Sequence, residues 1–259
     1  KLIDILVAGV VQGSMFRVPV EQYVEAGRDT DIRIIAQNLG LFWPGRPRSA
    51  KLLYTEPEGF TTAMCRASAS TYWKAGVDGL YLWNNQIIPF EIDPNYDRQP
   101  WKEIASQRTI AKLDKHYLVD NKPYGELFAR ELGSPTIPSS PLPVSLAGQG
   151  DSAELSIDIA DDVSEAESTG SLLEATLRIM IVNLTAEDKL NFKVNGEPLN
   201  RSAAQTKLLY NDCWMEFDVS GTLLRQGWNR IQVVVLQRNS KIDAPLTIES
   251  VEAIVRYGT

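Results

Sequence analysis

The stretch from Gly76 to Asn85 joins a helix stop to a short apolar run and then to polar residues. Gly76 can take the left-handed backbone conformation that ends many helices. The apolar run Gly79–Leu82 is typical of a buried strand, and it leads directly into Trp83 and Asn84. In a parallel α/β fold, strands deliver functional side chains at their carboxyl ends in this way. We therefore take this helix–strand unit as the repeating unit of the first half of the chain.

Similar units precede this stretch. Leu2–Gly9 is a nearly continuous apolar run, which predicts a parallel strand buried on both faces, and Asp31–Asn38 predicts the next strand. Residues Thr55–Glu58 match a capping box, so we expect the helix that ends at Gly76 to begin there. A further helical pattern runs over Trp101–Ala111. Between the first two strands, an apolar stripe at helical spacing is formed by Val20, Tyr23 and Val24.

The alternation of strand and helix over residues 1–133 predicts a parallel α/β domain. A complete (β/α)8 barrel needs eight strand–helix units and about 250 residues. The three units found here favour the last units of a TIM barrel whose earlier strands precede Lys1. The spacing leaves one alternative open, a small open sheet that is complete in itself.

The hydrophobic pattern changes after Gly133–Pro143, a segment with four prolines and three serines in eleven residues, which is typical of a linker. Beyond it apolar and polar residues alternate, and the dipeptide Asn195-Gly196 predicts a tight β-hairpin. These features predict an all-β domain over residues 134–259, a β-sandwich of the jelly-roll type. Its strands are expected at Glu154–Ile159, Leu173–Val182, Leu190–Val194, Trp214–Val219, Arg230–Leu236 and Ile248–Val255.

Composition disfavours several classes of function. The formal net charge is -7 and both signs are spread along the chain, whereas nucleic-acid binders concentrate basic residues on one face. The sequence contains no apolar run of ~18 residues, so it predicts no membrane-spanning helix. With a single histidine, His116, and two distant cysteines, we expect neither a metal site nor a cofactor. His116 itself is expected to be a cation near the end of a helix.

Two parts of the sequence carry a resemblance to known proteins. Leu2–Gly9 and Arg66–Asn84 resemble the end of the catalytic barrel in bacterial glycoside-hydrolase-like proteins, where the corresponding pieces read LVDxLVAG and RAxAxxxxxAGxDGxYLWN. The second half is similar to galactose-binding-like jelly rolls that accompany glycosidases. Its matching pieces are Phe192–Gly196, Phe217–Val219 and Leu224–Val233.

The resemblance implies a glycoside-hydrolase-like protein that binds or hydrolyses carbohydrate, with a barrel end in residues 1–133 and an accessory β-sandwich in residues 134–259. It also implies that an upstream barrel segment or a partner chain completes the barrel, and it slightly favours a periplasmic or secreted location. Whether the chain is an enzyme that hydrolyses O-glycosidic bonds stays open, because neither motif is a catalytic signature. The alternative is a non-catalytic carbohydrate-binding or structural module.

Candidate substrate-binding residues lie at the three predicted strand ends. Sugar sites combine aromatic faces with amide and guanidinium hydrogen-bonding groups. The strand ends offer this mixture in Trp83, Asn84, Asn85, Asn38, Trp43 and Arg17. A plainer role is open for each of them, since Trp83 can plug the mouth of a barrel and asparagines can cap a loop.

Candidate catalytic residues are scarce. Glycoside hydrolysis normally takes two carboxyl groups, which in a barrel project from the carboxyl ends of strands. No acid follows the first two predicted strands, and only Glu91 and Asp93 follow the third. These two carboxylates are therefore the weak catalytic candidates, with a solvated loop as the plainer reading and an upstream acid pair as the other source.

In the second half, Asp161 and Asp162 could contribute to a calcium site, but two adjacent acids fall far short of the six or more oxygen ligands that calcium takes. A turn is therefore the expected role for them. Trp214 and Trp228 lie at a strand start and beside a turn glycine. We expect both tryptophans to pack in the core or at an edge.

Overall fold

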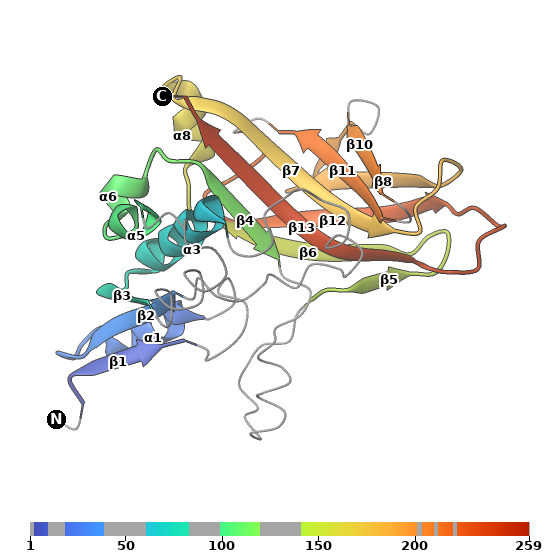
Figure 1. Cartoon of the computed structure of the whole chain (residues 1–259). Helices are drawn as coiled ribbons and strands as arrows, with labels where there is room; N and C mark the ends of the chain where they lie inside the picture. The colour runs from blue at the N-terminus through green and yellow to red at the C-terminus, as the bar shows by residue number, and fades with distance from the viewer. Residues whose placement is uncertain are drawn as a thin grey trace, which may run out of the picture. The chain divides into compact units, whose positions relative to one another are not determined.

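The computed structural model describes residues 3–9, 19–38, 61–82, 99–119, 141–200, 204–209, 212–219 and 222–258. Within these ranges, residues up to 115 belong to one compact unit, and residues 116–119 and 141–258 to another. The first is an α/β unit and the second is built of β-sheets (Figure 1). Because residues 120–140 lie outside the described ranges, a domain boundary near residue 133 stays a prediction. No helix in the described ranges has the length and apolarity to cross a membrane.

The α/β unit contains a parallel sheet in the order β1 (Ile5–Ala8), β2 (Arg33–Asn38), β3 (Gly79–Leu82). Its helices are α1 (Val20–Gly27), α3 (Thr62–Ala75), α5 (Gln99–Glu103) and α6 (Gln107–Ile110). The predicted alternation of strands and helices is therefore confirmed. A closed barrel is not shown, so the TIM-barrel part of the fold prediction stays a prediction.

One face of the parallel sheet packs against the helices. Ala8, Ala36 and Leu80 are neighbours in register on this face, and they join one apolar cluster with Val20 of α1 and Tyr72 of α3. A second cluster extends the same layer, with Cys65, Ala69, Ile104 and Ile110 around Leu80 and Leu82. Right-handed crossovers between strands that follow one another in order place their helices on a single face.

The other face of β1 is exposed, which corrects the prediction of a strand buried on both faces. Side chains alternate along a strand, so Leu6 and Ala8 face the helices while Ile5 and Val7 point away from them. Ile5 and Val7 are each 46% exposed, and Tyr81 of β3 is 41% exposed. The run is apolar throughout, but among the described residues a packing layer covers only one of its faces.

The turn from α3 into β3 explains the Ala-Gly-Val-Asp-Gly piece of the sequence. Gly76 follows α3 with φ of 90°, the left-handed helix end that was predicted. The Asp78 carboxylate accepts a hydrogen bond from the Ile34 backbone N–H at 2.7 Å, and the Asp78 N–H donates to the Ile34 carbonyl at 2.7 Å. Asp78 therefore fastens β3 to β2 at the end opposite the strands' carboxyl ends, where its role is structural.

Two helix predictions need correction. The helix that ends at Gly76 is capped by Thr61, whose hydroxyl accepts from the Met64 N–H at 3.2 Å, rather than by Thr55. Threonine is a favoured N-cap residue, and Thr61 takes this role with an extended backbone directly before α3. The pattern over residues 101–111 forms α5 and α6 instead of one helix, because Ser106 caps a new helix by accepting from the Thr109 N–H.

The second unit is a β-sandwich, as predicted. One sheet has the order β10 (Gln205–Leu209), β11 (Asp212–Asp218), β7 (Leu172–Val182), β13 (Leu246–Tyr257), β4 (Lys115–Val119), with β5 (Val144–Leu146) also paired to β13. The other has the order β6 (Ser152–Ile159), β12 (Gly227–Gln237), β8 (Lys189–Val194), β9 (Glu197–Leu199). Every strand range expected in residues 134–259 is present, and β9 is the second strand of the predicted hairpin. β5 and β10 are additional, and β4 comes from residues that were assigned to the first domain.

The inward side chains of the two sheets form the sandwich core. The rings of Phe192 on β8 and Phe217 on β11 meet at 5.0 Å between centroids, one contact between the sheets. Around them lie side chains that are at most 2% exposed, including Leu155, Ile157, Leu177, Ile179, Ile231, Val233 and Val251. Asn195 and Gly196 take φ of 52° and 92° and join β8 to β9 in register, so the predicted hairpin is confirmed.

His116 belongs to this sandwich, which corrects its assignment to a helix end. It lies in β4, the strand that extends the sheet beyond β13 (Figure 1). Its Nε2 lies 2.8 Å from the Glu252 carboxylate of β13, and Glu252 is also 3.5 Å from Arg178 of β7. The partner stands 136 residues away, so nothing near His116 in the sequence indicated this pairing.

Asn229 connects two motifs that are far apart in the sequence. This buried side chain accepts hydrogen bonds from the Arg225 N–H at 2.8 Å and the Asn195 amide at 2.9 Å. Its own amide donates to the carbonyls of Arg225 at 2.7 Å and Gly227 at 2.9 Å. The Asn195 side-chain oxygen in turn accepts from the Arg230 N–H at 3.0 Å. The Val-Asn-Gly and Gly-Trp-Asn pieces are therefore one hydrogen-bonded corner of the sandwich.

The variant Asn229→Ala is expected to lose about 3 kcal/mol of unfolding free energy, because it leaves several buried polar groups without partners. Urea denaturation at neutral pH measures this loss. Asn191→Ala, on the outward side of β8, is the matched control and should change stability by no more than about 0.5 kcal/mol. Equal losses in the two variants would contradict the structural role of Asn229.

Candidate functional site

The carboxyl ends of β1, β2 and β3 define the edge at which a site was predicted. Asn38 and Leu82 are register partners at the last position of their strands, and Trp83 follows Leu82 in the chain. Gly9, at the end of β1, stands so close to Gln37 that an added Cβ would lie 2.2 Å from the Gln37 Cβ. A glycine is therefore required at that strand end, and the three strands reach one edge together.

The side chains predicted to bind or react at this edge lie outside the described ranges. They are Arg17, Trp43, Trp83, Asn84, Asn85, Glu91 and Asp93. Asn38 is described only as the last backbone position of β2. The strand register brings the Asn38 backbone beside the chain that leads into Trp83. The grouping of these side chains into a site stays a prediction.

Trp228 is the aromatic side chain that sequence reasoning misjudged. It is 68% exposed at the start of β12, so the expectation that it packs in the core or at an edge is wrong. Trp214, by contrast, is 3% exposed and carries the Arg178 guanidinium at 4.4 Å from its ring centroid, which confirms packing. Both tryptophans point away from the sandwich core, and of the two only Trp214 is covered.

Polar side chains lie beside Trp228 and follow it along the outward face of the sheet. Trp228 stands opposite Asp158 of β6, and Arg230, two residues further along β12, stands opposite Ser156. Arg230 forms an ion pair with Glu154, and Gln232 stands between Glu154 on one side and Lys193 of β8 on the other. We call this surface the Trp228 face, defined by Trp228, Asp158, Ser156, Arg230, Glu154, Gln232 and Lys193.

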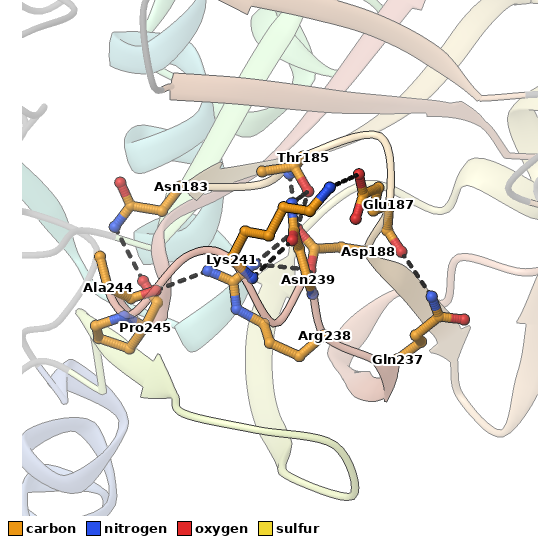
Figure 2. Close-up of polar contacts among 10 residues, drawn as sticks. All are labelled: Asn183, Thr185, Glu187, Asp188, Gln237, Arg238, Asn239, Lys241, Ala244 and Pro245. Atoms are coloured by element: carbon orange, nitrogen blue, oxygen red, sulfur yellow. Dashed lines mark hydrogen bonds and ion pairs between the residues drawn. The ribbon is translucent and has the colours of Figure 1, made fainter.

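A second polar group joins the loop after β7 to the loop after β12 (Figure 2). Asp188, whose side chain is fully buried, accepts from the Asn239 N–H at 2.7 Å and from Arg238 Nη1 at 2.7 and 2.8 Å. It also accepts from the backbone and hydroxyl of Thr185 at 2.7 and 2.8 Å. Arg238 extends the link by donating to the Ala244 carbonyl at 2.7 Å. Since Asp188 is fully engaged by protein donors, this group is a structural clamp between two loops.

The pKa of Asp188 lies below its ordinary value. Burial by itself would raise it, but the hydrogen bonds that the carboxylate accepts from Asn239, Arg238 and Thr185 outweigh burial. A carboxyl whose folded-state pKa is lowered stabilises the fold fully above its unfolded pKa. That stabilisation is lost as pH falls through the folded pKa.

The variant Asp188→Asn is therefore expected to lose about 3 kcal/mol of stability at pH 7, because it leaves Arg238 buried without its anion. The difference in unfolding free energy between wild type and variant should decrease as the pH is lowered into the acid range. Urea denaturation over a pH series tests this, with Asp243→Asn in the exposed part of the same loop as control. If this difference in unfolding free energy stays constant with pH, the negative charge of Asp188 does not provide the lost stability.

Asp162, one of the acids expected in a turn, caps a short helix instead. Its carboxylate accepts from the Glu165 N–H at 2.9 Å at the start of α8 (Val163–Ser168). Asp161 beside it is 7% exposed. Among the residues that the structure describes, no group of three or more histidine, cysteine, aspartate or glutamate side chains could hold a metal ion.

Comparisons with known proteins found no matching family model and no matching curated protein. Among solved structures, the chain is similar to a β-porphyranase of glycoside hydrolase family 86 from the human gut bacterium Bacteroides plebeius, with a TM-score of 0.35 and 12% identity over 56% of this chain. It spans only 21% of that porphyranase.

Two further solved structures are similar at lower TM-scores. A family 35 carbohydrate binding module from an environmental isolate has a TM-score of 0.26 and 17% identity, over 44% of this chain and 69% of the module. A two-domain esterase active on acetylated mannans has a TM-score of 0.26 and 8% identity, over 99% of this chain and 73% of the esterase. Scores this low do not establish a shared fold.

Proposed function

We propose that this chain is the C-terminal part of a glycoside-hydrolase-like protein that binds or acts on carbohydrate. In this proposal the α/β unit forms the last units of a (β/α)8 barrel, and residues 134–259, with β4 joined to one of their sheets, form the accessory β-sandwich, of the jelly-roll type. Among the described residues, helices pack against only one face of the parallel sheet, and this observation carries the proposal. Helices surround a TIM barrel only on the outside, whereas they cover both faces of a doubly wound sheet.

The exposed face of β1 suggests what is needed to complete the unit. Ile5 and Val7 would point into the interior of a barrel, where branched apolar side chains pack in layers. An upstream barrel segment or a partner chain would supply the neighbouring strands. The small open sheet, complete in itself, accounts less well for these exposed side chains, because parallel sheets normally bury both faces.

The substrate cleft is proposed at the carboxyl ends of β1–β3, the face of a barrel where active sites lie. Trp83 would supply the stacking surface, and Asn84, Asn85 and Asn38 would supply amide groups for sugar hydroxyls. Trp43 and Arg17 would line the same cleft from the loops that follow β2 and β1. No nucleic-acid or membrane partner is part of this proposal, and a periplasmic or secreted location is slightly favoured.

Replacing Trp83 by alanine is expected to weaken oligosaccharide binding by about fivefold or more, because truncating a central aromatic contact typically costs over about 1 kcal/mol. Titration of a panel of neutral hexasaccharides, followed by tryptophan fluorescence and calorimetry, measures the affinity. The variant Trp83→Phe keeps an aromatic ring and should retain part of the oligosaccharide affinity. An unchanged affinity in Trp83→Ala would remove Trp83 from the site.

Hydrolysis is the second part of the proposal, with Glu91 and Asp93 as the candidate carboxyl groups of this chain. If either acts as acid, base or nucleophile, Glu91→Gln or Asp93→Asn should abolish reducing-end release while leaving oligosaccharide affinity near that of wild type. The alternative, a non-catalytic carbohydrate-binding or structural module, predicts no release by the wild type at any pH. Release that persists at the wild-type rate in both variants would place the acid pair elsewhere.

A further inference from the structure

The exposed Trp228 side chain stands on a rigid part of the sandwich. Asn229, the next residue, is fully buried, and its side chain bonds to the Gly227 carbonyl at 2.9 Å on the other side of Trp228. The following residue is also held, because the Arg230 N–H donates to the Asn195 side chain. The backbone on both sides of the indole is therefore fixed, and little conformational freedom would be lost when a ligand stacks on it.

Trp228 differs from its outward neighbours in carrying a large aromatic side chain. A tryptophan side chain has a large apolar surface, and tryptophan is enriched among the residues that contribute most to binding at interfaces. The outward side chains that the strand register places beside it are polar or charged, namely Asp158, Ser156 and Arg230. A large aromatic surface beside a row of hydrogen-bonding groups suits a ligand that has both an apolar face and many hydroxyls.

The charges on the Trp228 face indicate a neutral ligand. Asp158 and Glu154 are balanced by Arg230 and Lys193, and the Arg230–Glu154 ion pair already neutralises two of the four. A nucleic acid or an anionic polymer would require an excess of cations here. An apolar protein partner would require a continuous apolar patch, whereas the register neighbours of Trp228 are polar.

We propose that the Trp228 face is a second binding site for a neutral oligosaccharide, with the Trp228 indole stacked on a sugar ring. Asp158 accepts hydrogen bonds from hydroxyls beside the stacked ring, and Ser156 accepts or donates them. Arg230 and Gln232 follow along the strand. Outward positions on one strand repeat every ~7 Å, so Trp228 to Gln232 offers a row of contacts ~13 Å long. The ligand class rests on the proposed function, but the site lies wholly in the sandwich and uses none of the residues of the proposed cleft.

The test compares Trp228→Ala, Trp228→Tyr and Leu173→Ala in the full chain by calorimetric titration with neutral hexasaccharides of glucose, mannose, xylose and galactose. Trp228→Ala should bind the responsive sugar at least about tenfold more weakly, while Trp228→Tyr keeps a stacking ring and part of the affinity. Leu173 is 70% exposed on β7 of the other sheet. The variant Leu173→Ala therefore controls for the loss of an exposed apolar side chain, and it should bind the sugar like wild type. Since Trp228 is exposed, all three variants should keep wild-type stability within about 0.5 kcal/mol.

Several results would overturn the proposal. It fails if no hexasaccharide binds at millimolar concentration, if binding is unchanged in Trp228→Ala, or if that variant instead abolishes self-association measured by sedimentation. Including Trp83→Ala separates the two sites. Loss of affinity only in Trp83→Ala would support the cleft and exclude the Trp228 face, and loss only in Trp228→Ala would do the reverse. Two binding events, one removed by each variant, would support both sites.

Discussion

Buried polar side chains that must be hydrogen-bonded hold this structure in register. Each buried donor or acceptor left without a partner would cost about 1–3 kcal/mol, so the chain is arranged around the few positions that satisfy them. Asn229 joins a hairpin turn to the start of β12, and Asp188 joins two loops at a sandwich end. In the α/β unit a more exposed carboxylate, that of Asp78, makes a comparable link and aligns β3 with β2. These side chains determine where the exposed residues beside them point.

The same constraint gives the motif residues a structural role. Asp78 was part of the piece that most resembled a glycoside-hydrolase barrel, yet it lies at the end of β3 opposite the predicted cleft. Asn195 and Asn229 carry the resemblance to galactose-binding-like sandwiches. Both side chains form hydrogen bonds that hold together the corner of the sandwich next to Trp228. The residues that make the sequence recognisable therefore build the frame, while the residues available to a ligand lie next to them.

Trp214 and Trp228 show why a candidate site could be only partly predicted. Each alternates with core residues, so strand period alone points both away from the sandwich interior. Trp214 is nevertheless buried over Arg178, and Trp228 is exposed. His116 shows the same limit, because its partner Glu252 lies on a strand that the sequence places 136 residues later. What covers an outward face depends on distant parts of the chain, and no local pattern records it.

The sequence by itself determined the features that depend on neighbouring residues. These are the alternation of β6 and β12, the left-handed turn at Asn195-Gly196 and the helix end at Gly76. Backbone sterics and side-chain period act within a few residues, so a pattern suffices. The tertiary structure alone decided that helices cover one face of the parallel sheet and that Trp228 stands exposed. Both facts concern which surfaces meet, and that is settled only when distant segments compete to bury the same apolar area.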